Sequence, residues 1–243
     1  MIKTGYYDIH THILPGVDDG SSDMKETINM LNMAYQQGIR TIIATPHYKA
    51  GRSNRPVEEL YKLRDEVDKQ AKKIDSNFTI LLGNELFYTE SIIEDLSHKK
   101  ALTLNGTNYV LVEFEFGETF KAIYRGLGNL IRSGYIPILA HVERYKSINK
   151  NIDLINEISE LGCYIQMNCN SLKGGLFNTQ AATNMKLVNC GLIHFLGSDC
   201  HNEKVRIPIM KSVIETLYKK CDKEIVDSIV LDNPLILLDN STI

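Results

Sequence analysis

Two histidines, His10 and His12, stand two positions apart at the end of the first apolar run, Asp8-Ile9-His10-Thr11-His12. Side chains two positions apart project from the same face of an extended strand. Two imidazoles on one face can ligate the same metal ion. The pair therefore indicates a buried metal site at the end of a strand.

Five later apolar runs also end in side chains that can bind metal. They are 41–47 with His47, 78–85 with Glu85, 109–113 with Glu113, 136–141 with His141, and 193–201 with Asp199 and His201. One further run, 163–168, ends in amides instead. Apolar runs without alternation are typical of strands covered on both faces, as in parallel sheets wrapped by helices.

Stretches with helical periodicity lie between these runs. We expect helices at 24–37, 56–74, 89–97, 119–133, 151–161, 178–190, 205–220 and 223–231. Asp23 and Glu26 are spaced as a capping box, and Pro56 suits a first helical position. Seven strands alternating with helices predict an α/β fold: a distorted, seven-stranded (β/α) barrel of the TIM type. In such a barrel the active site lies at the C-terminal ends of the strands.

Composition agrees with a single domain over residues 1–243, with 43% hydrophobic and 23% charged residues and no linker-like stretch. No signal segment and no apolar run of about 18 residues is present, so we expect a cytoplasmic protein without membrane insertion. A net charge of −3 argues against nucleic acid as the main partner.

The motifs DIHTH, VDDG, TPH, GNE, VEF, AHVERY and GSDCH together resemble the PHP superfamily. Within it, the chain is similar to the bacterial tyrosine-protein phosphatases of capsule and exopolysaccharide loci. The resemblance extends from Tyr6 to Asn233-Pro234 and Leu237-Leu238, which fit the closing helix of that family.

The resemblance implies three divalent metal ions, with Mn²⁺ as the expected metal and Fe or Zn also compatible with the ligands. It implies three ligand sets: His10, His12, Glu85 and Asp199 for one ion; Glu85, as a bridge, with Glu113 and His141 for a second; and Asp19, His47 and His201 for a third. Asp18 is an alternative to Asp19 because the two are adjacent.

Charge arithmetic also favours several cations. Four carboxylates buried together would repel one another and could not all stay ionised without compensation. Three divalent ions and one bridging hydroxide would leave a cluster of about +1, which attracts a phosphate dianion.

Arg144 and Arg206 resemble the phosphate-binding arginines of the family, which implies a catalytic and substrate-binding role for both. A guanidinium can bind two phosphoryl oxygens at once and stays protonated. The implied activity is metal-dependent hydrolysis of phosphotyrosine. The implied partner is the autophosphorylated tail of a bacterial tyrosine kinase that regulates capsular or exopolysaccharide synthesis.

Other functions compete with this interpretation. Cys200 and Arg206 fit the C-x5-R pattern of cysteine-dependent phosphatases, but the intervening residues contain no glycine and place Glu203 beside the phosphate. Histidinol phosphate or another small phosphomonoester is an alternative substrate. A nuclease and a non-catalytic metal-binding adaptor are weaker alternatives.

Two further features lie near the expected site. The segment 48–55, which follows His47, is locally basic and could bind an acidic phosphopeptide or be an ordinary surface loop. Phe114, Phe116 and Phe120 follow Glu113 and could line the entrance for a phosphotyrosine ring, although core packing is expected for at least one.

Overall fold

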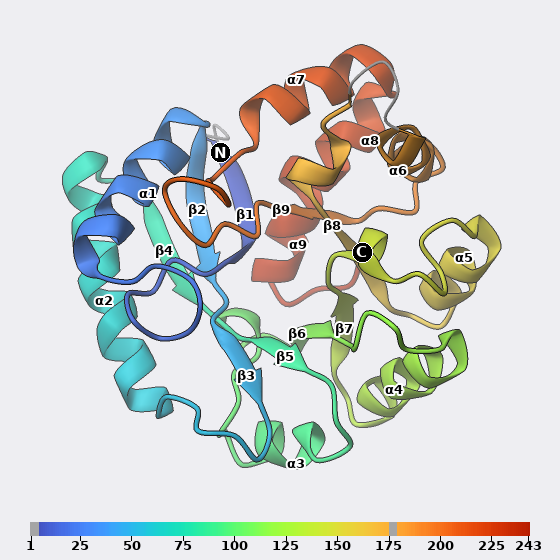
Figure 1. The fold of residues 1–243 in the computed structure, drawn as a ribbon, viewed down its shortest axis with the longest axis horizontal. Helices are drawn as coiled ribbons and strands as arrows, with labels where there is room; N and C mark the ends of the chain where they lie inside the picture. Colours follow the sequence, from blue (N-terminus) through green and yellow to red (C-terminus); the bar gives the residue numbers. More distant parts are fainter. Residues whose placement is uncertain (1–4, 175–178) are drawn as a thin grey trace.

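The computed structural model describes residues 5–174 and 179–243. Helices surround a set of parallel strands, as Figure 1 shows. The strands form two sheets with the orders β1-β2-β4 and β3-β5-β6-β7-β8-β9. Their bounds are β1 Tyr6–Thr11, β2 Ile39–Ala44, β3 His47–Lys49, β4 Thr79–Leu82, β5 Glu85–Phe87, β6 Tyr109–Glu113, β7 Ile136–Leu139, β8 Tyr164–Asn168 and β9 Phe195–Gly197.

The parallel α/β class is confirmed, but the single seven-stranded sheet is not. Two predicted strands are each divided: 41–47 becomes β2 and β3, and 78–85 becomes β4 and β5. Pro46, which has no N–H to donate, lies at the first break. Gly83 and Asn84 occupy the second. There the Asn84 amide donates to the Pro46 carbonyl at 2.9 Å.

The first and last strands lie side by side. Thr11 forms a parallel bridge with Cys200. The His12 N–H donates to the Cys200 carbonyl and the Asp199 N–H donates to the His10 carbonyl, both at 2.9 Å. Residues nearly 190 positions apart in the chain are thereby joined through their backbones.

The helices follow the predicted periodicity, with different ends. They are α1 Met24–Gln36, α2 Val57–Ile74, α3 Ile92–Ser97, α4 Phe120–Arg132, α5 Ile152–Glu160, α6 Thr179–Asn189, α7 Lys211–Lys220, α8 Lys223–Asp227 and α9 Asn233–Leu238. A π-helical turn, Ser228–Asp232, joins α8 to α9. Residue 178, the predicted start of α6, lies outside the described residues.

Two predicted helix starts and one predicted cap need correction. The helix expected from residue 205 begins at Lys211, because the residue before Pro208 is disfavoured in helical geometry. Pro56 precedes α2 rather than opening it. Asp23 does accept from the Glu26 N–H, but the Glu26 carboxylate accepts from Ser22, so the capping box is not reciprocal.

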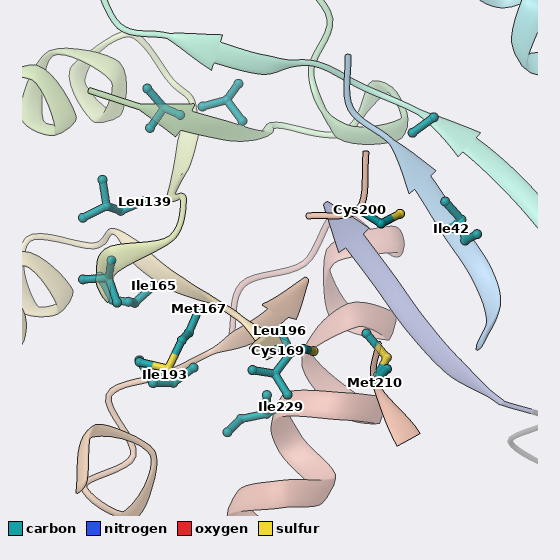
Figure 2. Close-up of a cluster of buried hydrophobic side chains, with 14 of the residues drawn as sticks. Ile42, Leu139, Ile165, Met167, Cys169, Ile193, Leu196, Cys200, Met210 and Ile229 are labelled. Atoms are coloured by element: carbon teal, nitrogen blue, oxygen red, sulfur yellow. The ribbon is translucent and has the colours of Figure 1, made fainter. Parts of the chain in front are cut away.

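The helices pack on the strands through a large apolar core, part of which is drawn in Figure 2. A smaller cluster joins side chains of β1, β2, β6, β7 and β9 to Leu237 of α9. No helix in the described part of the chain combines the length and the apolar character needed to cross a membrane.

Candidate metal centre

The structure brings all nine predicted ligands together at the C-terminal side of the strands. His10 and His12 meet first, with their Nε2 atoms 3.3 Å apart. Each Nε2 lies 3.2 Å from Oε2 of Glu85. Oδ1 of Asp199 lies 3.6 Å from the His10 Nε2 and 3.5 Å from the His12 Nε2. These four groups match the first predicted set.

The outward-facing nitrogens of three histidines have protein partners. Nδ1 of His10 lies 3.2 Å from Oε1 of Gln166, and Nδ1 of His12 lies 2.8 Å from Oδ2 of Asp18. Nδ1 of His201 lies 3.1 Å from the Asp199 carbonyl. Partners of this kind fix the tautomer and aim the other ring nitrogen, as they do for metal-bound histidines. In each case Nε2 is left facing the cluster.

The geometry separates the roles of Asp18 and Asp19. Asp18 is committed to protein donors: besides His12, it accepts from the backbone N–H of Gly20 and of His47, both at 2.9 Å. Oδ1 of Asp19 instead lies 3.4 Å from Nε2 of both His47 and His201. Asp19 therefore faces the cluster, and Asp18 orients a ligand from behind.

The second predicted set gathers around Glu85. Nε2 of His141 lies 2.8 Å from Oε1 of Glu85 and 3.5 Å from Oε2 of Glu113. His47 adds its Nδ1, at 3.1 Å from Glu85 and 3.5 Å from Glu113. His47 thus lies between the second and third sets rather than in the third alone. It opens β3 directly opposite Glu85, which opens β5.

The third set contains a buried ring nitrogen that makes no hydrogen bond with any described residue. Nε2 of His201 is buried without a hydrogen-bond partner, and it faces Asp19. His12, Asp19, His47 and His201 each offer one atom, and these atoms lie within 4.8 Å of one another. Asp19 is the exposed member, with 65% of its side chain accessible. The set therefore opens toward solvent.

Two of the predicted ligands occupy backbone conformations that non-glycine residues rarely adopt. His141 has φ of 35° and Asp199 has φ of 52°. A left-handed non-glycine residue costs on the order of 1–3 kcal/mol, and such residues concentrate at functional sites. Gly197 permits close approach behind them, since a Cβ there would lie 2.6 Å from Cβ of His10.

Arg144 and Arg206 both reach the cluster through Asp199. Nη2 of Arg144 lies 2.6 Å from Oδ2, and Nη2 of Arg206 lies 2.7 Å from Oδ1. Each side chain is 35% exposed. A guanidinium has five N–H donors, so each arginine keeps donors for an anion at the mouth of the site.

Burial and charge act in opposite directions on the histidines. Burial lowers the pKa of His12, but Asp18, Asp199 and Glu85 raise it well above its usual range. Burial also lowers the pKa values of His47 and His141, but hydrogen bonds to Glu113 and Glu85 outweigh burial. The pKa of His47 is raised to about 10 and that of His141 to about 9.

His201 shows the opposite result. Burial, together with the positive charges of His12 and Arg206 nearby, lowers the pKa of His201 to about 4.

The carboxylates respond to the same neighbours. Burial raises the pKa of Glu85, but His10, His12 and His141 lower it well below its usual range. The carboxylates thus draw positive charge onto the imidazoles around them, and divalent cations would satisfy the same oxygens. Imidazole nitrogens with carboxylate oxygens suit Mn, Fe or Zn, so the donor set fits the expected metals.

The cysteine alternative is contradicted by the structure. Cys200 is 1% exposed. It belongs to the apolar core, and Figure 2 draws it among the buried side chains. Burial raises the pKa of its thiol, and Asp8 and Asp199 add to that rise. A nucleophilic cysteine needs a depressed pKa and access to substrate. Cys200 has neither property.

Two amides outside the predicted set, Gln166 and Asn168, contact the predicted ligands. Gln166 binds His10 and also accepts from the His141 N–H at 2.8 Å. Its own amide donates to Asn168 at 2.9 Å, and Asn168 donates to Asp199 at 2.7 Å. The sequence did contain an indication of these two residues, since the 163–168 strand ends in amides where the neighbouring strands end in predicted ligands.

The fold and the site define a class: α/β proteins with a cluster of histidines and carboxylates where parallel strands end. A family model for capsular polysaccharide synthesis, CpsB/CapC, matches residues 6–239. The chain belongs to this family, which confirms the resemblance seen in the motifs.

Curated relatives cover nearly the whole chain. Tyrosine-protein phosphatase CpsB of Streptococcus agalactiae serotype III is 34% identical over 96% of this chain and 98% of its own. Tyrosine-protein phosphatase YwqE of Bacillus subtilis is 36% identical over 97% of this chain and 92% of its own.

Solved structures agree with the fold. One from a study of Bacillus subtilis YwqE and Streptococcus pneumoniae CpsB, described as metal-dependent tyrosine phosphatases, superimposes with a TM-score of 0.88 at 35% identity, covering 98% of this chain and 96% of the other. The phosphotriesterase homology protein of Escherichia coli superimposes with a TM-score of 0.62 at 12% identity, covering 98% and 100%. This second likeness concerns the fold alone.

Proposed function

We propose that this protein is a metal-dependent protein-tyrosine phosphatase, a phosphoric monoester hydrolase. The observation that carries the proposal is the convergence of five histidines and four carboxylates beside two arginines at one mouth. Membership of a family whose curated relatives are tyrosine-protein phosphatases supports the same activity.

We infer that the two sheets together make a distorted (β/α) barrel of seven strands, with β2–β3 and β4–β5 each acting as one interrupted strand. The β1–β9 backbone contacts support this inference.

Three divalent ions, with Mn²⁺ expected, would be held by the three ligand sets. They would lower the pKa of a bound water and neutralise phosphoryl oxygens. Glu85 contacts His10, His12, His47 and His141, which supports a bridging role for its carboxylate. His12 and His47 each face two sets.

The two arginines would bind the phosphoryl group. Asp199 holds one Nη2 of each, which turns both guanidinium groups toward the same mouth. Their remaining N–H donors could bind phosphoryl oxygens as charge builds up during transfer. The leaving tyrosine has an ordinary pKa near 10, so it needs less protonation than an alkoxide would.

Phe116 is placed to contact the substrate ring. Its side chain is exposed, and its ring lies 5.5 Å from His141 and 5.7 Å from the Arg144 guanidinium carbon. Phe114 instead is buried and stacks on Tyr88. An exposed ring beside the phosphate site favours an aryl phosphate over an alkyl one.

The physiological substrate would be the autophosphorylated tail of a tyrosine kinase that regulates polysaccharide synthesis, and the site of action the cytoplasm. The capsular family assignment supports this context.

The test is phosphate release from a phosphotyrosine peptide by the Mn²⁺-loaded protein, in competition with histidinol phosphate. Chelation should abolish turnover, and His10→Ala should lower kcat/KM by more than about 100-fold. Cys200→Ser and His194→Gln, which leave the ligands intact, should retain activity.

Turnover that survives chelation but disappears in Cys200→Ser would overturn the metal mechanism. Preferred hydrolysis of histidinol phosphate would assign a small-molecule substrate instead. Metal-dependent binding of the peptide without any turnover would indicate an adaptor.

A further inference from the structure

A basic groove lies next to β3, the strand that opens with the predicted ligand His47. It is formed by Arg52 and Arg55 of the loop before α2, and by Lys99 and Lys100 after α3. The groove encloses about 420 Å³. Tyr48, Asn54 and Arg55 also line a second cavity of about 230 Å³, which includes His47 and Asp18 in its wall. The groove therefore lies beside β3, the strand that begins with the predicted ligand His47.

Charge in the groove is unbalanced. Its four cations face one carboxylate in the lining, that of Glu58. Arg55 is paired with Glu59 at 3.3 Å, and Lys100 with Asp95 at 3.6 Å. Within the described residues, Arg52 and Lys99 have no carboxylate within ion-pair distance. These two cations are available to an external anion.

The walls of the groove are fixed by hydrogen bonds. The Asn54 side chain accepts from the Lys49 N–H at 3.0 Å and donates to the carbonyls of Lys49 and Arg52, which closes the loop. Arg55 donates to the Gly16 carbonyl at 2.8 Å, on the loop that carries Asp18 and Asp19.

The opposite wall is tied down as well. The Tyr48 hydroxyl donates to Asp95 at 3.0 Å, which holds the end of α3 against β3. The backbone segments that carry Arg52 and Lys99 are thus held on the two sides of the groove.

We propose that the basic groove binds acidic side chains that flank the phosphotyrosine of a peptide substrate. This inference rests on the proposed function and refines its substrate class. A peptide entering the mouth with its phosphotyrosine would continue along the groove. Carboxylates at its flanks would meet Arg52 and Lys99, which lack partners of their own.

The test compares two phosphotyrosine peptides of equal length, one with glutamates and one with glutamines beside the phosphotyrosine. The wild type should show a kcat/KM about three- to tenfold higher for the glutamate peptide. The ratio should fall in high salt, because exposed charges are screened. Arg52→Gln/Lys99→Gln should bring the ratio close to one.

The matched control is Lys219→Gln/Lys220→Gln on α7. It removes the same charge from two exposed lysines away from the groove, and the ratio should remain that of the wild type.

The inference is overturned if the wild type does not distinguish the peptides, or if Arg52→Gln/Lys99→Gln keeps the full preference. Preferred binding of anionic phospholipid vesicles or an acidic polysaccharide through Arg52 would also overturn it.

A binding measurement distinguishes failure of the groove proposal from failure of the proposed phosphatase activity. Dissociation constants for the same two peptides carrying a non-hydrolysable phosphonate test the groove without turnover. Absence of hydrolysis with an intact binding preference would reject the activity and keep the groove.

Discussion

Among single residues, the groups behind the ligands decide where the ligands point. Gln166 touches two predicted ligands at once, through the His10 ring and the His141 backbone. It is fully buried, so it cannot exchange these partners for water without moving the strand.

Gln166→Met should therefore weaken metal binding by about 10- to 100-fold, because His10 loses the acceptor that fixes its ring. Competition with a chelating dye measures the affinity. The urea midpoint of the metal-free variant serves as the control for folding. Unchanged metal affinity would mean that His10 is aimed by packing alone.

His194 gives a pH dependence outside the metal centre. Burial lowers its pKa to about 4, and its Nδ1 accepts from the Ile165 N–H at 3.1 Å. A proton on that nitrogen would face another donor. The unfolded chain has an ordinary histidine pKa near 6.5 and binds the proton first, so stability from this group is present above about pH 6.5 and is lost as pH falls toward 4.

Between pH 7 and pH 5 this residue should account for about 2 kcal/mol of lost unfolding free energy. His194→Gln keeps a hydrogen-bond acceptor and removes the titrating group. Between pH 7 and pH 5 the variant should therefore lose about 2 kcal/mol less unfolding free energy than the wild type. Urea unfolding of both chelated proteins at the two pH values measures the difference. Parallel curves would contradict the assignment.

At the scale of elements, the breaks in two strands position ligands. Pro46 and Gly83 end β2 and β4, and the chain re-enters as β3 and β5 with His47 and Glu85 in register. The breaks allow β3 to pair with β5 in a second sheet, separate from the sheet in which β2 pairs with β4. The close approach of β9 to β1 depends in the same way on Gly197.

Gly197→Ala should destabilise the fold by about 1–3 kcal/mol and weaken metal binding, since the new methyl group would displace His10. Gly117→Ala is the matched control, because a Cβ there meets nothing within 4 Å. Urea unfolding and metal titration of both variants give the comparison. Equal stability of the two would show that β1 and β9 can move apart freely.

At the scale of the whole molecule, the metal centre joins the two ends of the sequence. His10 lies in the first strand and His12 directly follows it, and Asp199 and His201 follow the last strand. Groups that bind only in the folded state stabilise it by mass action.

Saturating Mn²⁺ at about 100 times its Kd should add about 2.7 kcal/mol per site, or roughly 5–10 °C in Tm. Thermal unfolding with chelator and with added Mn²⁺ measures the shift. His10→Ala should lose most of it, and His194→Gln should keep it. A Tm that does not change when Mn²⁺ is added would argue against a metal centre that joins β1 to the segment after β9.

The sequence by itself determined the repeating unit and the candidate ligands. Apolar runs, helical periodicity and the side chains after each run follow from local patterns, because burial on both faces and the period of a strand are visible in order along the chain. The motifs then indicated the family, and the structure brought the residues they named together.

Only the tertiary structure decided how those ligands are shared and held. Asp18 and Asp19 are adjacent and chemically alike, and the choice between them depends on which one meets the His47 backbone. The strand breaks, the Gln166 contacts and the burial of Cys200 likewise arise from contacts between distant segments. Such contacts depend on how β1, β8 and β9 pack in space. A local sequence pattern does not specify the distance between residues that are far apart in the chain.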